Sequence, residues 1–358
     1  MENRIDAMGM LDLIVRPGFC VKDNTIVKVN QAAAAWGLAP GTGIQTLLLT
    51  GKEEYAEFQD GCLYLTISVG GESWGTSVTR MGDFHIFLME QEADQAELQA
   101  MALAARELRE PLANVMTTAD RLFPMSALQE DPAIREQVAR MNRGLLQMLR
   151  VIGNMSDANR YASDSGSRME ARDICSLLQE IFDHSGELLS HGNLKLRFQN
   201  LPTPIHCLVD SEKLERAVLN ILSNAMKFTP KGGTVDCSLT RRGNMLYLQV
   251  QDTGSGIAEN LKGSIHSRYL RKPGLEDSRF GIGLGMVLIR STAALHGGTV
   301  LIDQPQDGGT RITMTLAIRQ NTEGNLRSNI LRVDYAGERD HALLELAENL
   351  PASLFDKH

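Results

Sequence analysis

The sequence predicts a multidomain α+β protein of 358 residues, in which a small α/β module precedes a long antiparallel helical hairpin and an α/β sandwich. Three observations lead to this fold class. Short segments of alternating hydrophobicity come first, heptad-spaced apolar residues follow, and helical and strand patterns then alternate. These changes of pattern predict domains at 1–92, 93–162 and 163–320, followed by a C-terminal tail at 321–358.

Composition and charge exclude several classes of protein. The formal net charge is -8 and the basic residues do not cluster, so we expect no binding to nucleic acid. No apolar run approaches the roughly 20 residues of a membrane-spanning helix, and the charges of Glu2, Arg4 and Asp6 exclude a signal peptide. The 5 cysteines are scattered and form no C-x-x-C pair. We therefore expect a cytoplasmic protein without a membrane span.

Residues 1–92 predict a small sensor module. Segments at 25–30, 63–69 and 84–88 alternate apolar and polar residues between glycine, Asp and Asn turns, as expected of short strands. The stretch from Gly18 to Asn30 resembles the opening of a PAS domain, in which a pair of strands leads into a helix that starts at an asparagine. The resemblance implies a PAS-like sensor, and its residues carry no cofactor signature.

Two heptad seams predict a pair of long antiparallel helices joined by a turn before Pro132. The seams consist of Leu98, Met101, Ala105, Leu108, Leu112, Val115, Ala119 and Leu122, and then Ile134, Val138, Met141, Leu145, Met148, Ile152 and Met155. Because each apolar stripe is narrow, one hairpin buries too little surface by itself. We expect a homodimer through residues 94–160, which completes a four-helix bundle.

The third domain alternates helices and strands. Helical patterns occupy 173–189, 211–228 and 285–295, and strand patterns occupy 194–199, 234–239, 245–251, 299–303 and 310–317. This arrangement predicts helices packed on one sheet. An amphipathic stretch at 340–350 ends at Pro351, and the sequence assigns it no role.

Three polar constellations in this domain could form a binding site. Asn220, Asn224 and Lys227 follow one another at i, i+4 and i+7 on a helix. Asparagine carbonyls can hold Mg²⁺ or its waters, and a nearby ammonium group attracts phosphate. The alternative for these three residues is an ordinary solvated face.

The second constellation follows a strand and the third opens a helix. Asp252, Gly254 and Gly256 stand at a strand end, where a carboxylate could accept from an exocyclic amine and glycines let the backbone approach a flat base. An ordinary turn is the alternative for this segment. Gly281, Gly283 and Gly285 precede a helix whose N-terminus would face phosphate, but their spacing does not fit a dinucleotide fold.

In this order, the constellations resemble the N box and two glycine boxes of the gyrase, mismatch-repair and histidine-kinase ATPase superfamily. Gly308, Gly309 and Thr310 are similar to its last glycine motif, and with the hairpin the resemblance extends over 94–318 and points to sensor histidine kinases. It implies ATP and Mg²⁺ as ligands. By resemblance, Asp252 contacts the adenine amine, Asn224 coordinates Mg²⁺ beside Asn220, and Lys227 faces phosphate.

The same resemblance implies a lid over residues 258–280. The lid contains five basic residues suited to a triphosphate, namely Lys262, Arg268, Arg271, Lys272 and Arg279. The chain departs from the family pattern in this region. It has Ile265 to Tyr269 where two phenylalanines are usual, and Ile282 where a threonine is usual.

The phospho-accepting histidine of the family is missing. The family motif H-E-L-R-T-P-L is matched by residues 106–112, in which Arg106 replaces histidine, Glu107 is kept and Glu110 replaces threonine. A guanidinium group has no free lone pair with which to attack phosphorus, so autophosphorylation at this position is excluded. Glu110 would repel an acyl phosphate. We also expect an ion pair between Arg106 and Glu110, either as an ordinary surface contact or with a specific signalling role, and a bend at Pro111.

The sequence therefore predicts an ATP-binding sensor histidine kinase homologue of two-component signalling that cannot phosphorylate itself at the usual site. Its expected partners are a second copy, an active histidine kinase in a heterodimer, or a response regulator. Two alternatives stay open. The chain could act as a kinase in trans on a partner's histidine, or it could be a non-catalytic regulatory scaffold.

Overall fold

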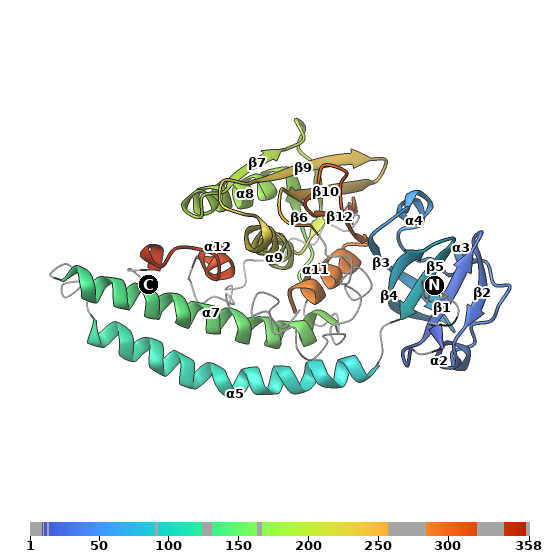
Figure 1. Cartoon of the computed structure of the whole chain (residues 1–358), viewed down its shortest axis with the longest axis horizontal. Helices are drawn as coiled ribbons and strands as arrows, with labels where there is room; N and C mark the ends of the chain where they lie inside the picture. Colours follow the sequence, from blue (N-terminus) through green and yellow to red (C-terminus); the bar gives the residue numbers. More distant parts are fainter. Residues whose placement is uncertain are drawn as a thin grey trace, which may run out of the picture.

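The computed structural model describes residues 9, 11–12, 14–89, 92–123, 131–162, 167–256, 284–320 and 340–355. Figure 1 shows a long helical hairpin beneath a sandwich of helices and strands, with a second group of strands at the N-terminal end. The mixed α+β class predicted from the sequence is confirmed. The expected lid at 258–280, with Arg271, and the glycines Gly281 and Gly283 lie outside the described residues.

The N-terminal module is an antiparallel sheet in the order β2-β1-β5-β4-β3. Its strands are β1 (Gly18–Lys22), β2 (Thr25–Val29), β3 (Cys62–Val69), β4 (Glu72–Met81) and β5 (Phe84–Met89), with the short helices α2 (Gln31–Ala35), α3 (Ile44–Leu47) and α4 (Lys52–Glu57). The three predicted strands are confirmed. The sequence did not predict β4, whose Glu72–Gly75 half carries little apolar alternation.

Asn30 starts α2 as expected and also holds the module together. Its Oδ1 accepts from the N–H groups of Ala33 at 2.9 Å and Gly18 at 3.1 Å. Its Nδ2 donates to the carbonyls of Ile14 and Arg16. A buried asparagine with all these bonds satisfied fixes the chain before β1 against the start of the helix.

The hairpin consists of α5 (Glu92–Leu122) and α7 (Pro132–Ala162). Each predicted heptad seam contains two kinds of position. On α5, Ala105 and Leu112 are buried against α7, whereas Leu108, Val115 and Leu122 are 49%, 53% and 67% exposed. The expectation of one core-facing stripe was therefore too simple, because three members of the α5 seam are exposed.

Arg106 and Glu110 are both exposed on α5, and the ion pair expected between them is absent from the contacts of the described residues. The prediction was wrong because an exposed pair gains little energy, while holding two long side chains together costs conformational entropy. Helix α5 continues through Pro111 as a single helix.

The domain that follows the hairpin is a sandwich with helices over one face of a sheet. Its helices are α8 (Ile174–His191), α9 (Ser211–Phe228) and α11 (Leu284–Leu295), and its strands are β7 (Lys195–Gln199), β9 (Thr234–Arg242), β10 (Met245–Asp252), β11 (Val300–Asp303) and β12 (Arg311–Ala317). The predicted helices and strands are confirmed. A small two-stranded sheet, β6 (Glu170–Asp173) with β8 (His206–Val209), was not predicted. Alternate residues of β10, such as Leu246, Leu248 and Val250, face the helices and form the core.

The two groups of strands join into one ten-stranded sheet, which the sequence did not predict. Strand β3 pairs with β11 antiparallel, with Leu63 opposite Leu301. Gly61 precedes this junction at a φ of 90°, and a Cβ there would overlap the carbonyl oxygen of Ile302. The guanidinium of Arg290 on α11 lies 4.6 Å from the ring centroid of Tyr64 on β3. The N-terminal module therefore touches the sandwich through both sheet and helix.

The C-terminal segment is the second feature without a predicted position. It comprises α12 (His341–Leu346) and the 3₁₀ helix η2 (Ala352–Phe355), and α12 lies between α7 and α9 in Figure 1. The predicted amphipathic stretch is confirmed as a helix, but the helix is shorter than the pattern. Asp340 caps it by accepting from the N–H of Leu343 at 3.0 Å. Leu343, Leu346 and Phe355 are buried.

Candidate nucleotide site

Helix α9 carries the first polar constellation. Asp210 caps its start by accepting from the N–H of Lys213, and apolar residues such as Leu214 and Val218 bury the opposite face. Asn220 is buried, and its Nδ2 donates to the carbonyl of Arg216 at 2.9 Å. Asn224 and Lys227 are half-buried. The three predicted residues therefore do not form a freely solvated face.

Asp252 ends β10 in an environment built around its carboxylate. The side chain is 6% exposed, and its Oδ1 accepts from the N–H groups of Gly254 at 2.7 Å and Thr310 at 3.3 Å. Burial raises the pKa of this carboxyl, and the two N–H donors lower it. A buried acceptor held rigidly by backbone donors is suited to recognising a hydrogen-bond donor on a ligand.

Glycines are needed where the Asp252 turn packs against its neighbours. A Cβ on Gly254 would come within 2.5 Å of the carbonyl oxygen of Phe228, at the end of α9. A Cβ on Gly309, which has a φ of 77°, would overlap the carbonyl oxygen of Asp252. Gly256 has a φ of 69°. Three segments far apart in the sequence are therefore in direct backbone-to-backbone contact, with no side chain between them.

The third constellation touches the first. A Cβ on Gly285 would lie 2.7 Å from Oδ1 of Asn220, so the start of α11 rests directly on the polar face of α9. The same end of α11 packs on the hairpin, where Leu284 and Val287 form a cluster with Leu98, Met101 and Met155. The structure thus brings together Asn220, Gly285 and the hairpin, while Asp252, Gly254, Gly256 and Thr310 gather at the other end of α9.

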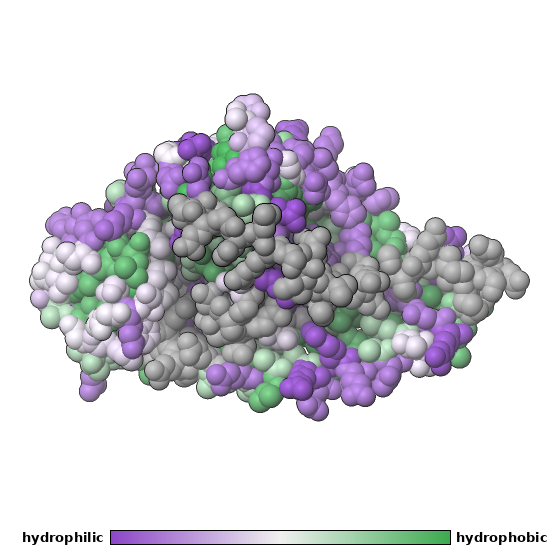
Figure 2. Space-filling view, turned by 180° about the vertical axis from the view of Figure 1, so that it is seen from behind, coloured by the Kyte–Doolittle hydropathy of each residue, from purple (hydrophilic) through white to green (hydrophobic). Residues whose placement is uncertain are grey.

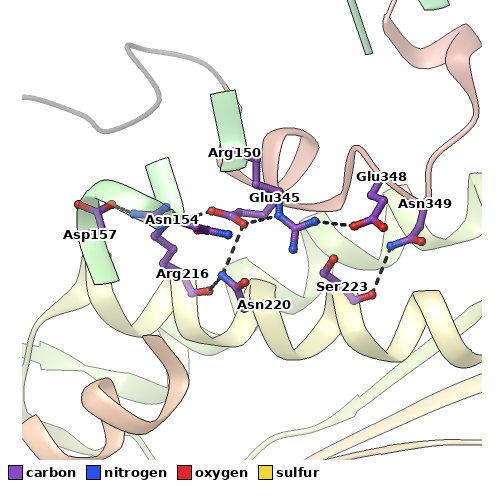
Figure 3. Close-up of polar contacts among 9 residues, drawn as sticks. All are labelled: Arg150, Asn154, Asp157, Arg216, Asn220, Ser223, Glu345, Glu348 and Asn349. Atoms are coloured by element: carbon purple, nitrogen blue, oxygen red, sulfur yellow. Dashed lines mark hydrogen bonds and ion pairs between the residues drawn. The ribbon is translucent and has the colours of Figure 1, made fainter. Parts of the chain in front are cut away.

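Arg216 is a residue of this region that the sequence did not single out. Its side chain is 1% exposed, and its guanidinium forms ion pairs with Asp157 of α7 and Glu345 of α12. A further hydrogen bond of 2.7 Å joins it to Asn154. Figure 3 shows these side chains converging between the three helices. A signal existed in the sequence, because Arg216 shares the helix face of Asn220 at i, i+4.

Glu345 is the centre of this network. It is completely buried, and its carboxylate accepts hydrogen bonds from Nε of Arg216 at 3.1 Å and from Nε of Arg150 at 3.0 Å. Nδ2 of Asn220 lies 3.4 Å from its Oε2. Two arginines balance the buried carboxylate, as a charge removed from water requires. The network ties α7, α9 and the C-terminal segment together.

The described residues contain no group of three or more His, Cys, Asp and Glu side chains that could hold a metal ion. Mg²⁺ at a nucleotide site needs few protein ligands, because the phosphates and waters supply most of its oxygens. Asn224 is the predicted amide ligand, and it stands half-buried on α9.

Comparison with known proteins matches residues 209–320 to the model of the "Histidine kinase-, DNA gyrase B-, and HSP90-like ATPase" family. Hybrid signal transduction histidine kinase D of Dictyostelium discoideum is 28% identical over 246 residues, which are 66% of this chain and 16% of the relative. Histidine protein kinase DivJ of Caulobacter vibrioides is 31% identical over 249 residues, which are 64% of this chain and 40% of the relative. Among solved structures, the mycobacterial sensor histidine kinase MprB shares 29% identity, with a TM-score of 0.35 over 42% of this chain and 99% of that structure.

The helices, the sheet and the family match define residues 209–320 as an ATPase domain of the histidine kinase, gyrase B and HSP90 type. The relatives extend the likeness beyond that domain. These relatives are histidine kinases, and the likeness covers 64% to 66% of this chain. The chain spans 16% and 40% of the lengths of the two curated relatives named above. Among the described residues, no helix is long and apolar enough to cross a membrane.

Proposed function

We propose that the chain binds ATP with Mg²⁺ and takes part in two-component signalling without phosphorylating itself at the usual histidine position. The geometry around Asp252 carries the nucleotide part of this proposal. Both backbone donors reach Oδ1, so Oδ2 is the oxygen that would accept from the adenine amine. The missing side chains at Gly254 and Gly309 let the backbone close tightly around this carboxylate, which holds it in one position.

The phosphate side of the proposed site lies on α9 and α11. Asn224 would supply an amide oxygen to Mg²⁺, and Lys227 would supply a positive charge to the phosphates. Asn220, which contacts Gly285, would hold the start of α11 in place beside them. When bound, MgATP would supply an activated phosphoryl group. The residues of this chain would position that group and screen its charge.

Arg106 determines what can follow nucleotide binding. It stands exposed on α5, five residues after Met101, which packs against the start of α11. This contact supports a position for the acceptor box near the ATPase domain, as a kinase needs. A guanidinium cannot act as the nucleophile, and Glu110 places a negative charge one turn further along. We therefore propose that the kinase core is retained while its own acceptor is lost.

The double replacement Arg106→His with Glu110→Thr tests this part of the proposal. Incubation with γ-labelled MgATP is expected to give acid-labile label on the double variant and none on the wild-type chain. The variant that carries Arg106→His and also Asn224→Ala is the control, and it should stay unlabelled. Label on the wild-type chain at residue 106 would contradict the proposal outright.

We further propose a homodimer through residues 94–160. Leu108, Val115 and Leu122 recur every seven residues on α5 and stand exposed, which supports a helical partner on that side. Figure 2 shows hydrophobic residues among hydrophilic ones along its lower edge, where α5 runs.

We also propose a PAS-like sensor at 1–92. The N-terminal strand order β2-β1-β5-β4-β3 and the Asn30 cap support this proposal.

A second candidate function is transfer of phosphate in trans to a histidine of a partner kinase. The observation in its favour is that the surroundings of Asp252 and Asn220 are intact in a chain whose own acceptor is absent. Label on a co-purified histidine kinase that disappears with Asn224→Ala would support it. A response regulator and a cytoplasmic location remain predictions from the sequence.

A further inference from the structure

The C-terminal segment contacts one continuous stripe of α9. Arg216, Asn220, Ser223 and Lys227 share a helix face through spacings of four and three. Each meets an atom of the segment, and the contacts are Glu345 Oε1 to Arg216 Nε at 3.1 Å, Glu345 Oε2 to Asn220 Nδ2 at 3.4 Å, Asn349 Nδ2 to the Ser223 carbonyl at 3.3 Å, and Glu348 Oε1 to Lys227 Nζ at 2.9 Å. The stripe includes two of the residues proposed to face MgATP.

Helix α7 holds the segment from the other side. Its side chains donate to carbonyls of the segment, with Asn142 to Phe355 at 2.9 Å, Arg143 to Leu350 at 3.1 Å and Gln147 to Ala347 at 3.4 Å. Leu346, Leu350 and Phe355 are buried beneath these bonds. The segment would therefore stay in place even if a side chain at its exposed edge moved.

Glu348 is the side chain at that edge. Its side chain is 38% exposed, whereas Glu345 is completely buried between two arginines. Glu348 also lies 3.3 Å from Nη1 of Arg150, so it has a second cationic partner to which it can turn. Figure 3 shows the Glu348 carboxylate joined to the guanidinium of Arg150. Lys227 can therefore exchange its carboxylate partner without disturbing Glu345.

A glutamate carboxylate and a phosphate group can each accept a hydrogen bond from the ammonium group of a lysine, because both offer a negatively charged acceptor. The side chain of Lys227 is 10% exposed while it is paired with Glu348. A phosphate group of a nucleotide would have to take the place of this carboxylate in order to contact the ammonium group.

We propose that residues 340–355 are an acidic intramolecular ligand of the α9 stripe, and that Glu348 competes with the phosphates of MgATP for Lys227. This inference rests on the proposed nucleotide site. The segment lowers the apparent affinity for MgATP by the fraction of molecules in which Lys227 is paired with Glu348. A partner that draws the segment away would raise that affinity.

The test uses the full chain and isothermal titration with MgATP. Glu348→Gln removes the negative charge and keeps the size of the side chain, and it is expected to lower the Kd of MgATP by about two- to fivefold, the scale of a partly exposed ion pair. Glu136→Gln is the matched control, because it makes the same charge change at an exposed ion pair with Arg140 far from α9. It should leave the Kd unchanged.

Adenosine provides the second arm, because it has the base and no phosphate. Its affinity should be the same in the wild-type chain and in Glu348→Gln. Equal tightening of adenosine and MgATP, or no more tightening of MgATP than in Glu136→Gln, would overturn the competition at Lys227. If neither the wild-type chain nor either variant binds MgATP, the proposed nucleotide site itself fails, and this inference falls with it.

Discussion

Replacing Arg216 by methionine should destabilise the junction of α7, α9 and the C-terminal segment. The methionine keeps an unbranched apolar stem but removes the guanidinium that pairs with Asp157 and Glu345. Glu345 would still face Arg150 at 3.0 Å, whereas the buried Asp157 would lose its ion pair with Arg216. Breaking one buried ion pair costs about 3–5 kcal/mol, and because Glu345 keeps one partner we expect the lower end, about 3 kcal/mol.

Thermal denaturation of the full chain measures this effect. A loss of about 3 kcal/mol lowers the midpoint by roughly 6–12 °C for a domain of 150–250 residues. The control Arg140→Met breaks an exposed pair with Glu136 and should cost under about 1 kcal/mol. Adding Asp157→Leu to Arg216→Met should recover part of the loss, because the buried carboxylate that paired with Arg216 is then removed as well. A midpoint for Arg216→Met no lower than for Arg140→Met would refute the reasoning.

Three further predictions follow from particular contacts. Gly61→Ala should cost roughly 1–3 kcal/mol more than Gly70→Ala in thermal denaturation, because both residues have positive φ but only a Cβ at Gly61 overlaps β11. Burial lowers the pKa of His296 below 6.5 while its Nε2 accepts from the N–H of Asp210. The contribution of His296 to the free energy of unfolding should therefore be fully present above pH 6.5 and be lost as the pH drops below it. The free energy of unfolding should fall less steeply with decreasing pH in His296→Gln than in the exposed control His206→Gln. Because burial raises the pKa of Asp252, its charged form costs stability at neutral pH, so Asp252→Asn should melt no lower than wild type.

Local patterns predicted most helices and strands of the sandwich. The apolar spacing of α9 and the alternation in β10 depend on residues close in sequence, and both were readable. The order of the polar boxes also carried the resemblance that pointed to the ATPase domain. The spacing of the boxes could not show how closely they pack, which depends on contacts such as Gly285 against Asn220.

Contacts between distant segments account for what the sequence did not predict. The pairing of β3 with β11 joins residues more than 230 positions apart, and no local period reports such a partner. The C-terminal segment looked like an amphipathic helix, but its partners Arg150 and Arg216 stand on helices far earlier in the chain. The exposure of Leu108, Val115 and Leu122 on α5 could not be predicted either, because a heptad pattern does not show which apolar residues pack against a neighbour in the same chain.

The central claim is that Asp252 and the glycine turn around it form a nucleotide site, and titration calorimetry with MgATP tests it most directly. Wild type should show saturable binding, and Asp252→Asn should bind at least about tenfold more weakly, the scale of one charge-assisted hydrogen bond. An asparagine that still accepts from Gly254 would turn its NH₂ group toward the adenine amine, so two donors would face each other. Absence of binding at millimolar nucleotide in wild type and in Glu348→Gln, or equal affinity in wild type and Asp252→Asn, would contradict the claim.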